Sequence, residues 1–425
     1  MRKDYPLPHL FPRIQGKGET RNTNISRGWL SIALIGWVTA CTSATPTPTP
    51  PFSLWGDIIT FGQAEQMDAP SLWPFTDRVT ASWIGADETG IHQDMRLLTA
   101  SGLSERVVLP LPPKNPYAQQ MFPAIEGDVH LLWLDADADS VVRLYSALIA
   151  PEMTVERGPT PISEETTRRY TVMPNGDGSL WTISSGGLAI EPSLYAHWID
   201  PQGRPRLEDI YQIARDADWP ALTRANDSTI YLFWIRHTDG AVMRSTLLDG
   251  IPENITPISE TITLNPGDRL VNFSAGLDAT HGYLFWNVRR GDGAAETWLT
   301  SGLLDTETWS APVRLGFDRT KGNFESGFNS GAADAARGGD NWLAWSAALA
   351  GQFDVLPVAA AHGGELGIAY LRGGAVVGYQ AIVTVSGLIG LPALHTDRDR
   401  FVYLAWSEPN ASGKANLNLT TTRRF

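Results

Sequence analysis

Short runs of alternating apolar and polar residues recur along most of the chain, and most of them end in an aromatic residue. Seven runs end at Trp83, Trp133, Trp181, Trp234, Trp286, Trp345 and Trp406, at intervals of 48 to 61 residues. Alternation with a period of two predicts half-buried β-strands. Polar turns rich in Gly, Asp and Asn precede most of the runs. Self-similarity at such a period predicts a repeat architecture.

Each repeat contains about four strand-like segments. A second alternating segment follows several tryptophan runs, as at 141–149 and 241–248, and pairs such as Asp239-Gly240 predict tight hairpins between the two. A third short segment comes next, and then one rich in proline or small residues. Four short strands repeated about seven times predict an all-β fold, a β-propeller of seven blades. We expect the tryptophans to pack in the core between blades.

The number of blades is ambiguous between residues 340 and 400. Tyr370 stands in the place of a repeat tryptophan but follows Trp345 by only 25 residues, too few for a whole blade. Either the Trp345 strand is an insertion, or the Tyr370 strand is the outer strand of its blade. Both alternatives give seven blades, and the pattern leaves six to eight open.

The two ends of the repeat region complement each other. After Trp406 the chain has room for only one more strand, so the last blade lacks an outer strand. The segment WGDIITFG, residues 55–62, is predicted to supply it. Closing the ring in this way removes free sheet edges.

The N-terminal region has a different pattern. Residues 28–40 are apolar and uncharged, too short to cross a membrane, and follow six basic and two acidic residues. This order is typical of a secretory signal. The next segment, TSATPTPTPPF, alternates proline and threonine, which predicts an extended, semi-rigid tether.

The residues Val38-Thr39-Ala40-Cys41 resemble the lipobox of bacterial lipoproteins. In that family the cysteine is acylated and the chain is cut before it. The resemblance implies that Cys41 is the lipidation site, with a signal peptide at 1–40, a lipidated cysteine and tether at 41–52, and the propeller at 53–425. An uncleaved signal anchor with a free cysteine is the alternative.

The charge balance narrows the choice of partners. The chain has a net charge of −13, and the part after residue 40 holds 27 basic and 44 acidic residues, which gives −17. So acidic a body argues against binding nucleic acid or adhering electrostatically to anionic lipid. We therefore expect membrane contact through the lipid anchor only. Cys41 is the single cysteine, so no disulfide can form within the chain.

One repeat contains a motif-like stretch. Asp305-Thr306-Glu307-Thr308-Trp309 resembles the Asp-box of sialidase-like, BNR-type propellers, although it is one residue short and lacks the glycine. The resemblance implies a propeller of that type. A sialidase also needs an arginine triad, a Tyr-Glu pair and an Arg-Ile-Pro motif. The nearest match, Phe11–Ile14, precedes the signal core.

These patterns predict a lipoprotein at the cell membrane, anchored by lipid and facing the extracytoplasmic side. We expect a monomer that binds or scaffolds a protein or glycan ligand. A sialidase-like glycoside hydrolase is the alternative.

The loops that enter the innermost strands carry the candidate ligand-binding residues, because Arg, Tyr and Trp favour binding surfaces. The segments NPYAQQ, TTRRY, RDADW, GDRLVN and KGNFESGFN include Asn115, Tyr117, Asp218, Lys321, Asn323 and Glu325. The strongest candidates are Arg168, Arg169, Tyr170, Arg215, Asp216, Trp219, Asp268 and Arg269.

A metal site is a separate hypothesis. Asp135, Asp137 and Asp139 alternate as in the first half of many calcium loops, but the glycine and distal Glu of an EF-hand are missing. We therefore expect either a weak calcium site or a solvated hairpin turn without a cofactor.

Overall fold

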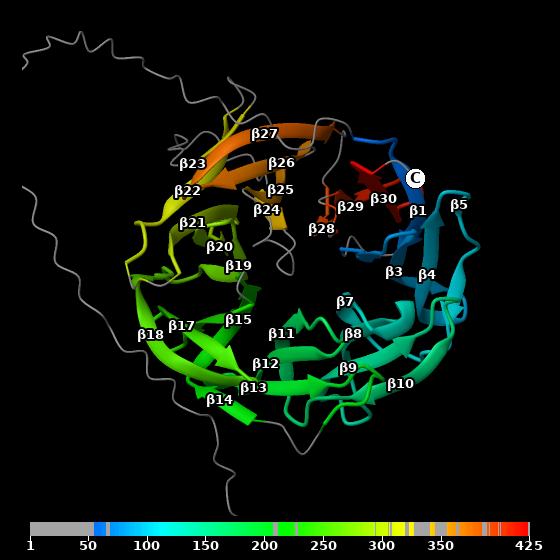
Figure 1. Cartoon of the computed structure of the whole chain (residues 1–425), viewed down its shortest axis with the longest axis horizontal. Coiled ribbons are helices and arrows are strands. Elements are labelled where there is room, and N and C mark those ends of the chain that lie inside the picture. The colour runs from blue at the N-terminus through cyan, green and yellow to red at the C-terminus, as the bar shows by residue number, and fades with distance from the viewer. Residues whose placement is uncertain are drawn as a thin grey trace, which may run out of the picture. The chain divides into compact units, whose positions relative to one another are not determined.

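The computed structural model describes residues 55–423 with gaps at 65–68, 207–210, 226–227, 294, 305, 307, 319–322, 327–340, 345–354, 363–364, 385–388, 391, 398 and 400. Cys41, the signal and the tether lie outside these residues. Seven small antiparallel sheets form a seven-bladed β-propeller, as Figure 1 shows. The predicted fold class and blade number are confirmed.

The first three blades follow one another along the chain. Blade 1 contains β2 (Ser71–Pro74), β3 (Arg78–Asp87), β4 (Gly90–Thr99), β5 (Gly102–Leu103) and β6 (Val107–Leu109). Blade 2 contains β7 (Tyr117–Pro123), β8 (Val129–Ala136), β9 (Val142–Ile149) and β10 (Val155–Pro161), with the short 3-10 helix η1 (Ile125–Gly127) between β7 and β8. Blade 3 contains β11 (Thr167–Pro174), β12 (Leu180–Leu188), β13 (Glu191–Ile199) and β14 (Tyr211–Arg215).

The other four blades complete the ring. Blade 4 contains β15 (Ala217–Arg224), β16 (Ile230–Arg236), β17 (Ala241–Leu248) and β18 (Ile251–Thr261). Blade 5 contains β19 (Arg269–Leu277), β20 (His281–Arg289), β21 (Ala295–Leu303), β22 (Val313–Asp318) and β23 (Asn323–Ser326). Blade 6 contains β24 (Asn341–Ala344), β25 (Leu356–His362), β26 (Glu365–Arg372) and β27 (Ala375–Thr384). Blade 7 contains β28 (Ala393–Thr396), β29 (Val402–Pro409), β30 (Ala415–Thr421) and β1 (Ile59–Ala64).

Blade 7 is built from both ends of the propeller. β1 is its outer strand and pairs antiparallel with β30, with Ile59 opposite Leu419 and Ala64 opposite Ala415. Phe61 of β1 is 1 % exposed and packs edge-on against Trp83, with ring centroids 5.7 Å apart. The N-terminal segment therefore closes the ring, as the sequence predicts.

Blade 6 resolves the ambiguity between residues 340 and 400. Tyr370 lies in β26, the third strand of the blade in pairing order, and β27 is the strand beyond it. The β24 strand pairs with β25 and is part of the blade. Both expected explanations are wrong, because the blade has the usual four strands and Tyr370 belongs to its third. Trp345 itself lies outside the described residues.

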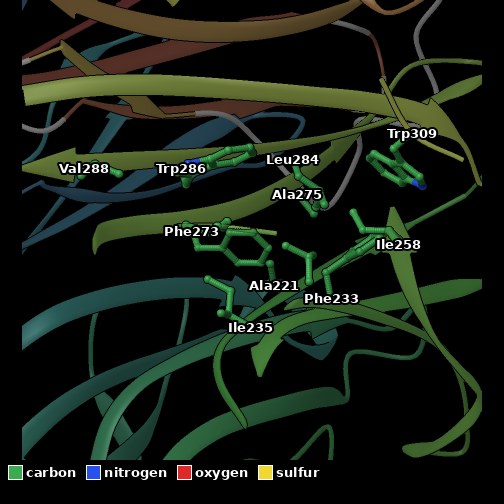
Figure 2. Close-up of a cluster of buried hydrophobic side chains, with 12 residues drawn as sticks. Ala221, Phe233, Ile235, Ile258, Phe273, Ala275, Leu284, Trp286, Val288 and Trp309 are labelled. Carbon is green, nitrogen blue, oxygen red and sulfur yellow. The ribbon is translucent and has the colours of Figure 1, made fainter. Parts of the chain in front are cut away.

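Most of the repeat tryptophans fill the space between blades. Trp83, Trp133, Trp234, Trp286 and Trp406 lie in the second or the equivalent strand of their blades and are at most 4 % exposed. Trp181 is half-buried and packs against Trp198 at a centroid distance of 4.6 Å. Figure 2 shows one such cluster between blades 4 and 5, where Trp286 and Trp309 flank Phe233 and Phe273.

The innermost strands define two faces of the propeller. In six blades these strands are β2, β7, β11, β15, β19 and β28. We call the face on which they begin the top face and the face on which they end the bottom face. None of the described residues forms a helix long and apolar enough to cross a membrane.

Candidate functional site

Four consecutive blades carry a β-bulge near the start of the innermost strand. The register shifts between Tyr117 and Gln120, between Thr167 and Arg169, between Asp218 and Ala221, and between Leu270 and Asn272. A bulge re-aims side chains and is over-represented beside active sites. The top face over blades 2 to 5 is therefore the first candidate for a functional surface.

Backbone strain marks two of these bulges. Ala118 has a φ of 52° and Trp219 a φ of 57°, and Asp216, just before β15, has a φ of 50°. Side-chain-bearing residues in this region cost of order 1 kcal/mol each and gather at functional sites. Surrounding contacts must hold such residues in place.

Asp218 is the centre of these contacts. Its carboxylate accepts hydrogen bonds from Nη1 of Arg169 at 2.6 and 2.7 Å, from the Ser185 hydroxyl and from the Trp219 backbone amide at 2.8 Å. The guanidinium of Arg169 also lies 3.5 Å above the Trp219 ring centroid, a close cation–π contact. Blade 3 and blade 4 are thus joined at the top face by one ion pair and one stack.

Tyr117 and Asp135 of blade 2 extend this arrangement. The Asp135 carboxylate accepts hydrogen bonds from the backbone amides of Lys114 and Asn115, at 2.9 and 2.7 Å, and so fixes the loop that enters β7. The Tyr117 side chain is 36 % exposed. Burial raises the pKa of Tyr117, with Arg169 opposing the rise and Asp135 adding to it. Arg169 and Asp135 therefore both act electrostatically on the Tyr117 hydroxyl.

We call Tyr117, Asp135, Arg169, Asp218 and Trp219 the top-face cluster. Its members come from three successive blades at bulged backbone: Arg169, Asp218 and Trp219 are in direct contact, and Arg169 and Asp135 act electrostatically on Tyr117. Aromatic rings can stack on the apolar faces of sugar rings, and carboxylate and guanidinium groups can bond hydroxyls. The cluster has the chemistry of a site for a polar, ring-shaped ligand.

The predicted arginines do not all join this cluster. Arg169 and Trp219 come together there, but Arg168 donates to the backbone carbonyls of Gly186, Gly187 and Leu188 at 3.2 to 3.3 Å. Arg215 donates to Gln212 and lines a separate pocket of about 380 Å³ at the edge of blade 3. These arginines therefore do not converge on one carboxylate site.

Asp216, Asp268 and Arg269 have separate positions. Asp216 accepts a hydrogen bond from the Thr238 hydroxyl at 2.6 Å. Asp268 is bound by Arg290 at 2.5 Å and by two backbone amides. Burial alone would raise the pKa of Asp268, but these bonds outweigh it and lower that pKa. Arg269 is exposed at the start of β19.

Tyr170 requires a correction. Its side chain is 8 % exposed and packs in the core between blades 2 and 3. Its hydroxyl lies 2.5 Å from the carbonyl oxygen of Ala118 and 3.1 Å from that of Leu132. Burial raises the pKa of Tyr170 well above its ordinary value. Tyr170 supports the bulge of blade 2 and is not exposed to a ligand.

The aspartates at 135, 137 and 139 do not form a calcium loop. Asp135 is used by the loop before β7, whereas Asp137 accepts from Nε of Arg143 at 2.7 Å and from the amides of Asp139 and Val141. Their carboxylates thus have different partners in a hairpin turn. Across the described parts of the chain, no group of three His, Cys, Asp or Glu side chains is placed to hold a metal ion.

Two further expectations concern blade 5. The segment with Asn323 and Glu325 forms β23, which pairs with β22 at the outer edge of the blade, so it does not begin an innermost strand as expected. Lys321, Asp305 and Glu307 lie outside the described residues. Trp309 of the Asp-box-like stretch is 4 % exposed and packs against Phe233.

Ser185 and the bulges have no recognisable signal in the sequence. Ser185 lies in the middle of a run of small residues in β12 and is fully buried. Asp135 is conspicuous in the sequence for its spacing from Asp137 and Asp139, but in the structure it accepts hydrogen bonds from backbone amides. A bulge inserts one residue into a strand, which periodicity over five or six residues does not reveal.

Comparisons with known proteins support the fold. No family model matches the chain, and no curated protein matches it. A solved structure described as a new family of polysaccharide lyase, PL25 ulvan lyase, is 10 % identical and covers 87 % of this chain and 98 % of its own, with a TM-score of 0.55. The same kind of lyase bound to -[GlcA(1-4)Rha3S]- is 9 % identical over 86 % and 96 % of the chains, with a TM-score of 0.54.

Polysaccharide lyase Uly1 is 10 % identical over 85 % of this chain and 91 % of its own, with a TM-score of 0.49. The likeness to the two ulvan lyase structures, at about 10 % identity, establishes the propeller fold alone.

Proposed function

We propose that this propeller binds polysaccharide chains across its top face. The observation that carries the proposal is the stack of Arg169 on Trp219 at bulged, strained backbone, with the exposed ring of Tyr117 at the bulge of the preceding blade. Such strain persists only where surrounding contacts enforce it, and Asp218 supplies those contacts here. A fold shared with glycan-acting lyases supports polysaccharide as the ligand class by analogy of fold.

The charge of the cluster favours uncharged sugars. The positive charge of Arg169 is neutralised by Asp218, and Asp135 of the same cluster has no cationic side chain among its hydrogen-bond partners in the described residues. An anionic chain would meet a net negative charge, whereas neutral hydroxyls can donate to these carboxylates.

The contacts of the two carboxylates in the cluster favour binding over cleavage. Burial raises the pKa of Tyr117, so the phenol keeps its proton at neutral pH and can donate a hydrogen bond to a ligand. The alternative activity, hydrolysis of a glycoside, needs two carboxyl groups facing one substrate. Asp218 is bonded to Arg169 and Asp135 to backbone amides, so both carboxylates already have partners within the protein.

Tyr117→Ala is expected to weaken polysaccharide binding at least about tenfold, because an exposed aromatic wall of the site is lost. Affinity electrophoresis in gels containing neutral or acidic polysaccharides measures the effect. Tyr211→Ala is the matched control, since Tyr211 is 44 % exposed at the start of β14, in the outer strand of blade 3.

The wild type and the Tyr211 variant should be retarded equally by a neutral polysaccharide, and the Tyr117 variant much less. Equal retardation of all three proteins would contradict the proposal. New chain ends released by the wild type, but not by the Tyr117 variant, would replace binding by cleavage.

We further propose that the propeller is held at the extracytoplasmic side of the membrane by a lipid on Cys41 and the Thr-Pro tether. Cys41→Ser should abolish processing and lipidation, so the precursor keeps its full length. Mass spectrometry of the protein from a membrane fraction measures this. A serine variant that matures to the same size and remains equally membrane-bound would exclude the anchor.

A further inference from the structure

The bottom end of the central channel contains a second pocket, far from the top-face cluster. It has a volume of about 410 Å³ and is lined by the ends of β2, β7, β11, β15 and β28 and by the turns after them. The innermost strands run from top to bottom, so this pocket and the top-face cluster lie at opposite ends of the same strands. The residues of the top-face cluster therefore do not account for this pocket.

Five of the fourteen residues that line the pocket are proline or aromatic. Pro74, Pro123 and Pro174 are the last residues of β2, β7 and β11, the innermost strands of three successive blades. Proline lacks an N–H group, so these positions present ring carbons in place of backbone donors. Trp73 and Phe75 add aromatic surface beside them. We call these five residues the apolar collar; polar and charged side chains line the rest of the pocket.

Arg224 interrupts this collar. It is the last residue of β15, the position that proline occupies in the three preceding blades. Its Nη2 donates to the side-chain oxygen of Asn175 at 2.9 Å, and no carboxylate among the described residues pairs with it. Burial lowers the pKa of Arg224, with no neighbouring acid to offset the effect. Half-burying a cation lowers the free energy of unfolding unless an anion pairs with the cation.

The other arginine of the pocket, Arg423, already has a counter-ion. Asp397 is 8 % exposed, accepts a hydrogen bond from the Tyr403 hydroxyl at 2.8 Å and pairs with Arg423 at 3.4 Å. Asp399 is exposed and also acts on Arg423, raising its pKa. Arg224 is therefore the cation of this pocket for which the described residues offer no counter-charge.

We propose that this bottom pocket binds a sugar acid, with the carboxylate on Arg224 and the ring against the proline and aromatic collar. A guanidinium can donate two parallel hydrogen bonds to a carboxylate, and the apolar collar fits the C–H face of a pyranose ring. The volume of about 410 Å³ accommodates one or two sugar units. This site is independent of the proposed top-face function.

Isothermal titration with glucuronate tests the proposal, with glucose as the uncharged ring and inorganic sulfate as the anion without a ring. Wild type should bind glucuronate more tightly than either. Arg224→Gln should raise the Kd for glucuronate at least about tenfold. Arg224→Lys should raise it by less, because lysine keeps the positive charge but lacks the two parallel donors of the guanidinium. Arg372→Gln is the control, since Arg372 is exposed in blade 6 and does not line the pocket.

The same variants distinguish ligand binding by Arg224 from a merely structural role. Arg224→Gln removes an uncompensated, half-buried charge, so its Tm should equal or exceed that of wild type. Tyr117→Ala should leave glucuronate binding unchanged, which separates this site from the top face. Undetectable glucuronate binding by the wild type, equal binding by Arg224→Gln, or equal affinity for glucose and glucuronate would each overturn the proposal.

Discussion

Phe61→Ala is expected to destabilise the propeller by about 3–5 kcal/mol, the usual loss when a large aromatic core side chain is truncated. Phe61 comes from β1, more than 350 residues before its partner strand β30, yet it is 1 % exposed and packs with Trp83 and Leu417. The cavity would open at the seam between blades 7 and 1. Chemical denaturation should give a lower midpoint with little change in m.

Ile58→Ala is the matched control for the closing strand. Ile58 lies three residues before Phe61 and is 47 % exposed, so its truncation should change stability by no more than about 0.5 kcal/mol. If both variants unfold at the wild-type midpoint, β1 does not hold the ring closed.

Asp218→Ala is expected to have the second largest effect, on stability and on binding together. Asp218 holds Arg169, Ser185 and the amide of Trp219, and its side chain is 14 % exposed. Its removal leaves Arg169 without a counter-ion and frees the strained Trp219 backbone. Losing one partner of a largely buried pair costs about 2–4 kcal/mol, and the residual exposure places this one near the lower end.

Polysaccharide binding by Asp218→Ala should fall at least as far as in Tyr117→Ala, because two members of the cluster lose their support. Asp77→Ala is the control. Asp77 also pairs with an arginine, Arg78 at 3.3 Å, but its side chain is 75 % exposed, and such pairs contribute about 0–1 kcal/mol. If Asp218→Ala and Asp77→Ala shift the denaturation midpoint and the gel retardation equally, Asp218 does not organise the site.

The overall architecture was predictable because it depends on repeated, local signals. Alternating strands that end in tryptophan gave the blades, since each buried tryptophan must face a neighbouring blade. The closing strand β1 was predictable because the C-terminal part of the chain has too few residues for the outer strand of blade 7. The sequence of blade 6 is ambiguous because Tyr370 lies in the third strand but is as buried as a residue of a second strand, with 1 % exposure.

The candidate site was predictable only in part. Loops that enter innermost strands pointed to Arg169 and Trp219, because position in a repeat says which face a residue occupies. Burial does not follow from position in a repeat, so the sequence does not distinguish Tyr170, which supports the backbone, from its neighbour Arg169 in the top-face cluster. The role proposed for Arg224 cannot be predicted from its residue type alone. It depends on Arg224 standing at the strand end where the neighbouring blade has a proline.

Hydrogen–deuterium exchange of the wild type, with and without a saturating neutral polysaccharide, tests the central claim most directly. Binding at the top-face cluster predicts slower exchange of backbone amides at 114–120, 168–170 and 216–219, where the loops enter β7, β11 and β15. The outer strands β10, β14 and β18 should exchange at unchanged rates. Protection confined to those outer strands, or to the turns of the bottom face, would contradict the account.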